Sequence, residues 1–322
     1  MIALFLASPA LLPACDTAAP EDSSTGDTGE DYVDERLTEA DVPALPDGGQ
    51  RWYGPDVIIE PGQEVQYCTF GTYTGEDIAI SSFDSYQGAV GHHLIILGTN
   101  ASTIDYPDGE VVDCTRTNTM MTSFEPLINA EPIDAGRASI VLPEGMGVKL
   151  NSGQRWVVQS HYVNTTTDRV RVKDIMNIGL VPEDSVTTWV AAYALTQTDL
   201  SIPPAQASSL SFDCTFPDSY HVMYLTGHMH EWGTSFSFDY SADGSDGSFA
   251  PIYEIPEWDP VYRDAPPLQH YAEGEFDFAA NSTLRTNCNW FNDTDEALEF
   301  PNEMCATYGM LYPSLNPVVC SD

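Results

Sequence analysis

Short apolar runs, each bounded by turn-forming residues, recur along most of this chain and limit it to a small set of folds. From about residue 51 onward the runs are rich in Val, Ile, Thr, Tyr and Phe, and Gly, Pro, Asn or Asp separates them. Such runs are typical of β-strands, and no long stretch shows the periodicity of a helix. With 42% apolar residues, 23 Gly and 23 Pro, the chain can form a core and many turns. We therefore predict an all-β protein of two tandem antiparallel β-sandwich domains of the jelly-roll type.

The domain boundary is predicted in a polar segment near the middle of the chain. At 322 residues, the sequence is long enough for two domains of ordinary size. Residues 182–188, PEDSVTT, separate two sets of predicted strands. We therefore expect an N-terminal sandwich over residues 49–185 and a C-terminal sandwich over residues 186–322.

The N-terminus carries features of an exported protein. Residues 1–15, MIALFLASPALLPAC, resemble the end of a bacterial lipoprotein signal in which Cys15 is acylated. The run lacks the basic region of a signal peptide, which leaves a misassigned, clipped or non-functional start as the alternative, and it is too short to span a bilayer. Residues 16–48 are polar and acidic and are predicted to form a disordered tether. We expect a bacterial, extracytoplasmic protein (periplasmic, outer-membrane lipoprotein or secreted) that contacts membranes through its lipid anchor alone.

The charge balance restricts the partners of the protein. The chain has 49 Asp and Glu but 11 Lys and Arg, which gives a net charge of −38. Nucleic acid is excluded as a partner, because binding by counterion release needs a basic surface. Loose adsorption to anionic lipid is disfavoured for the same reason. We interpret the acidity as a solvated surface that keeps the protein soluble.

The cysteines indicate disulfides. Six remain when Cys15 is set aside, namely Cys68, Cys114, Cys214, Cys288, Cys305 and Cys320. An even number without a CxxC motif, in an exported chain, favours disulfides over a cysteine metal site. The sequence by itself leaves their pairing open.

A pair of histidines in GHMHEWG points to a metal site in the second predicted domain. His228 and His230 stand two residues apart, so a strand directs both imidazoles to one face. Met304, in PNEMCATYGM, is a candidate third ligand, and a thioether favours copper, especially Cu(I). Thioether ligation is weak, so the fold must hold Met304 in place, which a disulfide at Cys305 would do. The alternative is two hydrogen-bonded histidines and a core methionine.

A second pair, His92 and His93 in GHHLIILG, poses a different geometric problem. Adjacent residues on a regular strand face opposite ways, so the two imidazoles share a metal only where the strand begins irregularly. Gly88 and Gly91 permit such an irregularity. His161, in VVQSHYVN, would supply the third imidazole. The alternative is that all three are ordinary hydrogen-bonded residues.

Four segments together resemble a known enzyme family. GHHLIILG, QSHYVN, GHMHEWG and NEMCATY occur in the order and near the spacing of the copper type II, ascorbate-dependent monooxygenases, which include peptidylglycine α-hydroxylating monooxygenase and dopamine β-monooxygenase. TDLSIPP is also similar, and the resemblance covers about residues 55 to 320. It implies two β-sandwich domains that each bind one copper ion, with ascorbate or a similar reductant as co-substrate.

The resemblance also implies roles for individual residues. The first copper, which stores and passes an electron, would be bound by His92, His93 and His161. The second copper, where dioxygen is activated and a substrate C–H bond is attacked, would be bound by His228, His230 and Met304. Two further matches, a glutamine near the first copper and a tyrosine of the substrate region, are Gln159 and Tyr308. The implied disulfides are Cys68–Cys114, Cys214–Cys320 and Cys288–Cys305.

Two positions depart from the peptide-hydroxylating members of the family. Their arginine before the histidine pair is Thr226 here, and their asparagine after the methionine is Ala306. Both family residues help hold a peptide carboxylate, which prefers a bidentate arginine. Arg263 and Arg285 are the candidates to replace that arginine from elsewhere in the domain. A glycine-extended peptide is therefore disfavoured as the substrate.

The sequence thus predicts a copper monooxygenase that hydroxylates a C–H bond of a small organic molecule with O2 and a one-electron reductant. A non-catalytic copper-binding lipoprotein for sequestration or delivery is the first alternative. A structural surface domain with incidental histidines is the second. No nucleotide-binding or haem motif is present.

Overall fold

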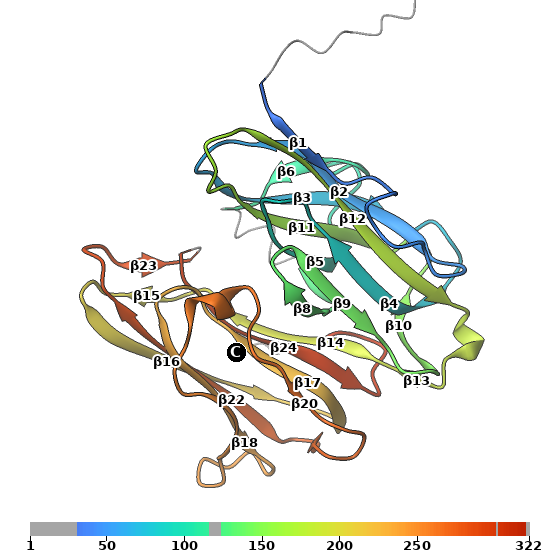
Figure 1. Cartoon of the computed structure of the whole chain (residues 1–322). Coiled ribbons are helices and arrows are strands. Elements are labelled where there is room, and N and C mark those ends of the chain that lie inside the picture. Colours follow the sequence, from blue (N-terminus) through green and yellow to red (C-terminus); the bar gives the residue numbers. More distant parts are fainter. Residues whose placement is uncertain (1–30, 116–123, 301, 320–322) are drawn as a thin grey trace, which may run out of the picture. The chain divides into compact units, whose positions relative to one another are not determined.

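Strands make up nearly all of the regular structure in this computed structural model, which describes residues 31–115, 124–300 and 302–319. The helical elements in these ranges are two short 3-10 helices, η1 (Glu183–Ser185) and η2 (Pro260–Arg263). Neither has the length or apolar character that a membrane-crossing helix requires. The predicted all-β class is confirmed (Figure 1).

Two sheets contain all strands that the structure describes up to residue 189. The eight-stranded sheet has the central order β1-β12-β4-β10-β13, with β2 on β12 and the β8–β9 pair on β4. Its strands are β1 (Val33–Arg36), β2 (Gln50–Ile59), β4 (Ile78–Tyr86), β8 (Glu131–Asp134), β9 (Arg137–Val141), β10 (Met146–Leu150), β12 (Val170–Val181) and β13 (Thr188–Trp189). The five-stranded sheet has the order β6-β3-β11-β5-β7. Its strands are β3 (Glu64–Thr72), β5 (Gly91–Thr99), β6 (Val111–Asp113), β7 (Phe124–Ile128) and β11 (Arg155–Val163).

Three sheets contain the strands from residue 191 onward. The six-stranded sheet has the order β20-β17-β24-β14-β25, with β21 also on β17. Its strands are β14 (Ala191–Gln197), β17 (Tyr220–His228), β20 (Gln269–His270), β21 (Asp277–Phe278), β24 (Cys305–Tyr312) and β25 (Val318–Val319). The four-stranded sheet has the order β16-β22-β18-β19. Its strands are β16 (Gln206–Thr215), β18 (Gly233–Ser241), β19 (Ala250–Ile255) and β22 (Thr283–Asn292). A two-stranded sheet consists of β15 (Ser201–Ile202) and β23 (Leu298–Glu299).

Alternating side chains pack the sheets face to face as sandwiches. In β18, Phe236 and Phe238 are buried, whereas Ser235 and Ser237, which alternate with them, are only partly buried. This two-residue period places one face of the strand on a core. Side chains of the four-stranded and six-stranded sheets, such as Trp290 and Leu225, join these phenylalanines in one apolar cluster. Two sheets that share a core in this way form a β-sandwich.

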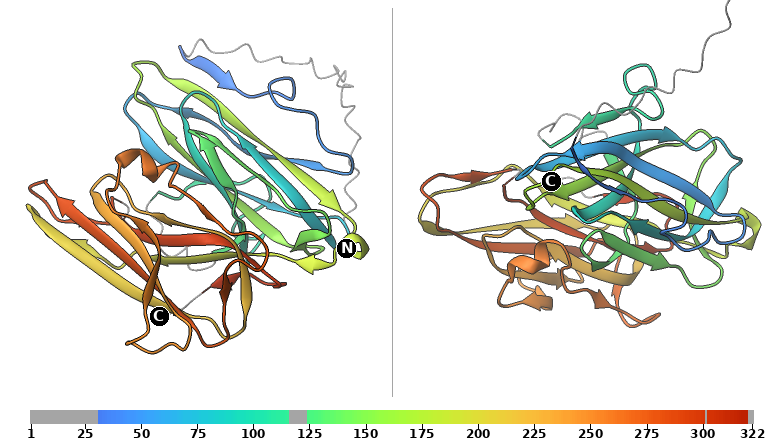
Figure 2. Two further views of the ribbon diagram at one scale, coloured as in Figure 1. Left: turned by 60° about the horizontal axis from the view of Figure 1, so that its bottom comes forward. Right: turned by 45° about the horizontal axis from the view of Figure 1, so that its top comes forward.

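Sheet membership changes between Trp189 and Ala191, close to the predicted domain boundary. The blue-to-green strands and the yellow-to-red strands form separate groups of sheets (Figure 2). The chain from Tyr32 onward nevertheless clusters as one compact unit, and one apolar cluster includes both Ile96 of β5 and Tyr224 of β17. A division into two independent domains at residue 185 therefore stays a prediction.

The disordered tether predicted over residues 16–48 extends too far toward the C-terminus, because part of this segment is a strand. Residues 1–30, with the signal and Cys15, lie outside the described residues, but β1 pairs in parallel with β12, and Val42 is buried. Arg36 within β1 is paired with Asp34 and Asp56, which offsets the acidity of the segment. The acidic composition of residues 16–48 does not indicate this short strand. The strand forms because β12 supplies its hydrogen bonds.

Candidate metal centre

A β-bulge brings His92, His93 and His161 together. His161 on β11 lies opposite His93 on β5, and the next pair joins Tyr162 to Gly91, so His92 is an extra residue in β5. A bulge re-aims the side chain that it inserts, which allows adjacent histidines to face one point. The three ring centroids are 4.7 to 5.6 Å apart. The irregular strand start predicted from the sequence is confirmed.

These three imidazoles have the geometry of metal ligands, and burial favours the neutral form of two of them, His93 and His161. Each offers a ring nitrogen, and the three nitrogens lie within 4.8 Å of one another. Burial is the main cause that lowers the pKa of His93 far below its ordinary value, and it also lowers the pKa of His161. Neutral imidazoles present lone pairs to a metal ion, whereas imidazolium cannot bind one.

Carboxylates contact the Nε2 atoms of two of the three rings. His161 Nε2 lies 3.0 Å from Glu64 Oε1, while its Nδ1 is buried without a hydrogen-bond partner in the described part of the chain. His92 Nε2 contacts the carboxylate of Asp264. A carboxylate on the far nitrogen is the usual arrangement around a metal-binding histidine, because it fixes the tautomer and the ring orientation. The orphaned Nδ1 of His161 is thus the atom that a metal ion would satisfy.

An arginine connects the surroundings of the two histidine groups. The guanidinium of Arg263, at the end of η2, contacts Glu64 and also Glu231, the residue after His230. The hydrogen bond from His161, together with Arg263, lowers the pKa of Glu64 to about 2. Glu64 is therefore a stable anion that can hold the proton on His161 Nε2.

The second histidine pair lies at the end of β17. The rings of His228 and His230 are 5.1 Å apart between centroids. Burial lowers the pKa of His228 far below its ordinary value and that of His230 to about 4. His230 Nδ1 lies 2.9 Å from the carbonyl oxygen of Asn302. A carbonyl only accepts, so Nδ1 carries the hydrogen and Nε2 keeps the lone pair for a metal.

The strand register places Met304 beside this pair. β17 and β24 pair in antiparallel fashion up to His228 and Ala306. Beyond that pair, Glu303 Oε2 accepts the backbone N–H groups of both His230 and Met304, so the predicted ligands lie on neighbouring chain segments. A contact between the Met304 sulfur and either imidazole stays a prediction.

Two of the three implied disulfides are confirmed. Cys68–Cys114 links β3 to the end of β6, with Cα atoms 5.8 Å apart. Cys288–Cys305 links β22 to the start of β24 directly after Met304, with Cα atoms 6.1 Å apart. Cys214 is also disulfide-bonded, but its implied partner Cys320 lies outside the described residues. Structural disulfides place the protein in an oxidising, extracytoplasmic compartment.

The two other site residues implied by the resemblance lie on the ligand-bearing strands. Gln159 precedes His161 by two residues on β11 and is buried beside the disulfide, with its Nε2 3.9 Å from Cys114 Sγ. Tyr308 lies opposite Thr226 in the β17–β24 pair, and burial raises its pKa. Their roles toward a copper ion or a substrate stay predictions.

Neither candidate arginine is available for a substrate carboxylate in this arrangement. Arg263 contacts Glu64 and Glu231, and Arg285 makes a bidentate pair with Asp213 in the four-stranded sheet. At the position of the family arginine, the hydroxyl of Thr226 donates to a backbone carbonyl 2.8 Å away. Both candidate arginines are thus already paired with carboxylates of the chain itself.

Sequence reasoning missed the acidic residues that surround the ligands. Glu64, Asp264 and Glu303 each contact a candidate ligand residue, yet they are three of 49 acidic residues. Adjacency to Met304 was the one signal that could have singled out Glu303. Glu64 and Asp264 are distant in the sequence from the histidines that they contact.

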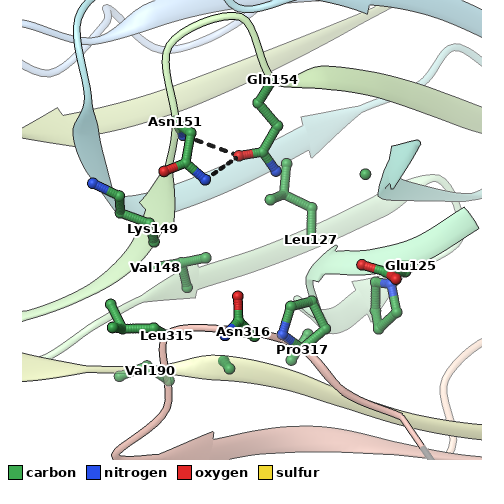
Figure 3. A pocket seen from close by; sticks show the side chains of 14 residues that line it. Glu125, Leu127, Val148, Lys149, Asn151, Gln154, Val190, Leu315, Asn316 and Pro317 are labelled. Carbon is green, nitrogen blue, oxygen red and sulfur yellow. Dashed lines mark hydrogen bonds between the residues drawn. The ribbon is translucent and has the colours of Figure 1, made fainter. Parts of the chain in front are cut away.

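A cavity of about 160 Å³ has no histidine in its lining, and Figure 3 shows the side chains that line it. Its wall includes Glu125, Lys149, Gln154 and Asn316, and none of the six candidate ligands lines it. The cavity therefore belongs to neither histidine group.

Comparisons with known proteins define no family for this chain. No family model and no curated protein matches it. Among solved structures, PNGase F, a glycosylasparaginase from Flavobacterium meningosepticum, matches with 11% identity and a TM-score of 0.41, covering 84% of this chain and 97% of that chain. The major capsid protein P2 of bacteriophage PM2 matches with 10% identity and a TM-score of 0.34, covering 81% and 97%. Both likenesses are too weak to assign an activity.

Proposed function

We propose that this chain is a copper-dependent monooxygenase that hydroxylates a C–H bond of a small organic substrate with O2 and a one-electron reductant such as ascorbate. The observation that carries the proposal is the convergence of His92, His93 and His161 from two strands, with a buried, unpartnered nitrogen on His161. The metal type comes from the sequence resemblance and from the thioether of Met304, a soft ligand that favours copper.

Bound copper would supply one-electron exchange and the activation of dioxygen. The residues of the first trio would contribute three imidazole nitrogens without a thiolate or an inner carboxylate. Such a set tolerates both Cu(I) and Cu(II), which an electron-storing site requires. Glu64 would keep the proton on His161 Nε2 and so hold Nδ1 free. Asp264 would orient His92 in the same way.

The second trio would form the site of substrate hydroxylation. The Asn302 carbonyl keeps the proton of His230 on Nδ1, so Nε2 would face the metal. His228 would add a second neutral nitrogen, and Met304 a weak sulfur ligand. A set of three protein ligands leaves a coordination position open for O2, as catalytic metal sites generally do.

The substrate would be recognised without a cationic clamp. Thr226 and Ala306 replace the family residues that hold a peptide carboxylate, and Arg263 is engaged with two glutamates. We therefore place the substrate among small organic molecules that do not depend on a carboxylate for binding. Hydroxylation of a glycine-extended peptide at a comparable rate would contradict this part of the proposal.

Turnover separates this function from copper sequestration or delivery. Copper-loaded protein is given ascorbate and a set of small organic substrates, and O2 uptake is compared with hydroxylated product. We expect coupled uptake and product in the wild type, none with Met304→Ala, and normal turnover with His270→Ala, which alters an exposed histidine outside both trios. Tight copper binding without any product would instead support the sequestration alternative.

Attachment to a membrane through Cys15 belongs to the same proposal. The supporting observation is the lipoprotein-like sequence that ends at this cysteine. Mass spectrometry of the mature bacterial protein should show an acylated Cys15 at its N-terminus. A mature chain that retains the preceding residues and an unmodified Cys15 would contradict it.

A further inference from the structure

The backbone ladder between the two ligand-bearing segments of the second site ends before the ligands are reached. After one irregularity between Val222 and Tyr224, the pairing of β17 with β24 continues without a register shift as far as His228 and Ala306. His230 and Met304 lie beyond that pair, where the ladder no longer fixes one segment against the other. A weak thioether ligand needs a fixed backbone, because its own affinity for the metal cannot order a mobile segment.

The carboxylate of Glu303 connects these segments. Its Oε2 accepts the backbone N–H of His230 at 3.0 Å and that of Met304 at 3.1 Å. Its Oε1 accepts the backbone N–H of Trp232 at 3.0 Å. The indole Nε1 of Trp290 donates to Oε2 at 3.0 Å. One side chain thus holds both sides of the interrupted ladder.

The surroundings of Glu303 are unusual for an acidic side chain. It is fully buried, and in the described ranges no lysine, arginine or histidine forms an ion pair with it. Burying a carboxylate is costly unless hydrogen bonds compensate, and here four N–H groups do so. Three of the four belong to the backbone of the segments that carry His230 and Met304.

From this geometry we infer that Glu303 is a positioning residue of the second metal site, which sets the spacing between His230 and Met304. This role rests on the proposed function. The disulfide at Cys305 holds the next residue from the opposite sheet, so Met304 is fixed on both sides. The Asn302 carbonyl on His230 Nδ1 completes the connection from the same segment.

The test compares Glu303→Gln with the wild type and with Glu299→Gln, which alters an exposed glutamate four residues earlier. Glutamine keeps one acceptor oxygen but places an N–H2 group against a backbone N–H. We expect Glu303→Gln to weaken Cu(I) binding at the second site by about tenfold, as loss of an outer partner typically does. Chelator competition measures the affinities, and X-ray absorption of the Cu(I)-loaded chain should lose its copper–sulfur contribution. The first-site affinity serves as an internal control and should not change.

Three results would overturn the inference. An unchanged second-site affinity with intact copper–sulfur scattering in Glu303→Gln removes the positioning role but leaves the proposed function standing. A wild-type chain that binds no second copper ion overturns the proposed function and the role of Glu303 with it. A third measurement needs no variant: in metal-free wild type, the amides of His230, Trp232 and Met304 should exchange slowly with solvent. Rapid exchange of all three would show that Glu303 does not hold them.

Discussion

Single hydrogen bonds determine which nitrogen each buried histidine can offer to a metal. The ring of His161 uses Nε2 toward Glu64, whereas the ring of His230 uses Nδ1 toward the carbonyl of Asn302. Burial lowers the pKa of both histidines, so each stays neutral at pH 7 with one proton and one lone pair. The two trios would therefore bind a metal through different ring nitrogens, Nδ1 of His161 in the first and Nε2 of His230 in the second.

Glu64→Gln tests this arrangement in the first trio. A neutral amide is a weaker acceptor than a carboxylate, so the His161 tautomer and ring orientation become less fixed. We expect copper affinity at the first site to fall by about tenfold while the second site is unchanged. Glu60→Gln, which alters an exposed glutamate paired with Arg169, is the control. Equal first-site affinity in both variants would show that Glu64 has no part in the site.

Asp174 should make stability depend on pH in the weakly acidic range. Burial raises its pKa from 3.8 to about 6, and Tyr162 donates to it at 2.6 Å. A raised pKa means that the folded state binds the proton more tightly than the unfolded chain does. The free energy of unfolding therefore falls by about 3 kcal/mol as the pH rises from about 4 through 6. Above that range, the ionisation of Asp174 causes no further change in stability.

Urea unfolding at a series of pH values measures this effect. The Asp174→Asn variant lacks the ionisation, so its free energy of unfolding should rise relative to wild type between pH 4 and 7. Asp105→Asn, at an exposed position, should follow the wild-type curve. Parallel curves for wild type and Asp174→Asn would contradict the assignment.

At the level of elements, the first trio depends on the irregular start of β5. Gly91 N–H donates to the Gly88 carbonyl at 2.8 Å, and this turn leads into the bulge at His92. A Cβ atom on Gly91 would lie 2.2 Å from the Cβ of Gln87, which leaves no room for a side chain. The position of the histidine pair is therefore tied to a glycine that no other residue type can replace without a backbone shift.

Gly91→Ala should accordingly displace His92 and His93 and abolish or strongly weaken metal binding by the first trio. Gly98→Ala on the same strand is the matched control, because a Cβ there would meet its nearest neighbour at an ordinary 3.6 Å. Isothermal titration with copper measures both variants. Wild-type binding by Gly91→Ala would mean that the bulge does not position the ligands.

The disulfide between β22 and β24 should support the second site in the same way. Its 17-residue sequence separation implies a contribution of about 3 kcal/mol to stability. We expect the double variant Cys288→Ser/Cys305→Ser to lose that stability and to bind Cu(I) more weakly at the second site. Removal of Cys68–Cys114 should destabilise the fold but leave second-site affinity unchanged. Equal second-site affinities in the two double variants would show that the Cys288–Cys305 disulfide does not help to hold Met304 in place.

Across the whole molecule, the sequence predicted those features that depend on local pattern. Two-residue alternation, as in the phenylalanines of β18, predicted an all-β chain, and Gly88 and Gly91 predicted the irregular start of β5. Both features depend only on residues that are close together in the sequence, so the sequence can predict them. Motif order predicted the His92, His93 and His161 group and, through the family resemblance, two disulfides that the structure contains.

Features that depend on distant contacts could not be predicted. β1 forms because the edge of β12 lies beside it, which the acidic composition of residues 16–48 does not reveal. Asp264 reaches His92 from a segment more than a hundred residues away along the chain. With a net charge of −38, no single carboxylate stands out in the sequence, so the acidic surroundings of the ligands appear only in the fold.

The most direct test of two separate metal sites is the copper content per chain, measured by elemental analysis after loading with Cu(I) and removal of excess metal. We predict two ions in the wild type, and one in each of the variants His161→Ala and His230→Ala. The two trios share no ligand, so the double variant should bind none. A wild type with fewer than two ions, or single variants that both retain two, would contradict the account.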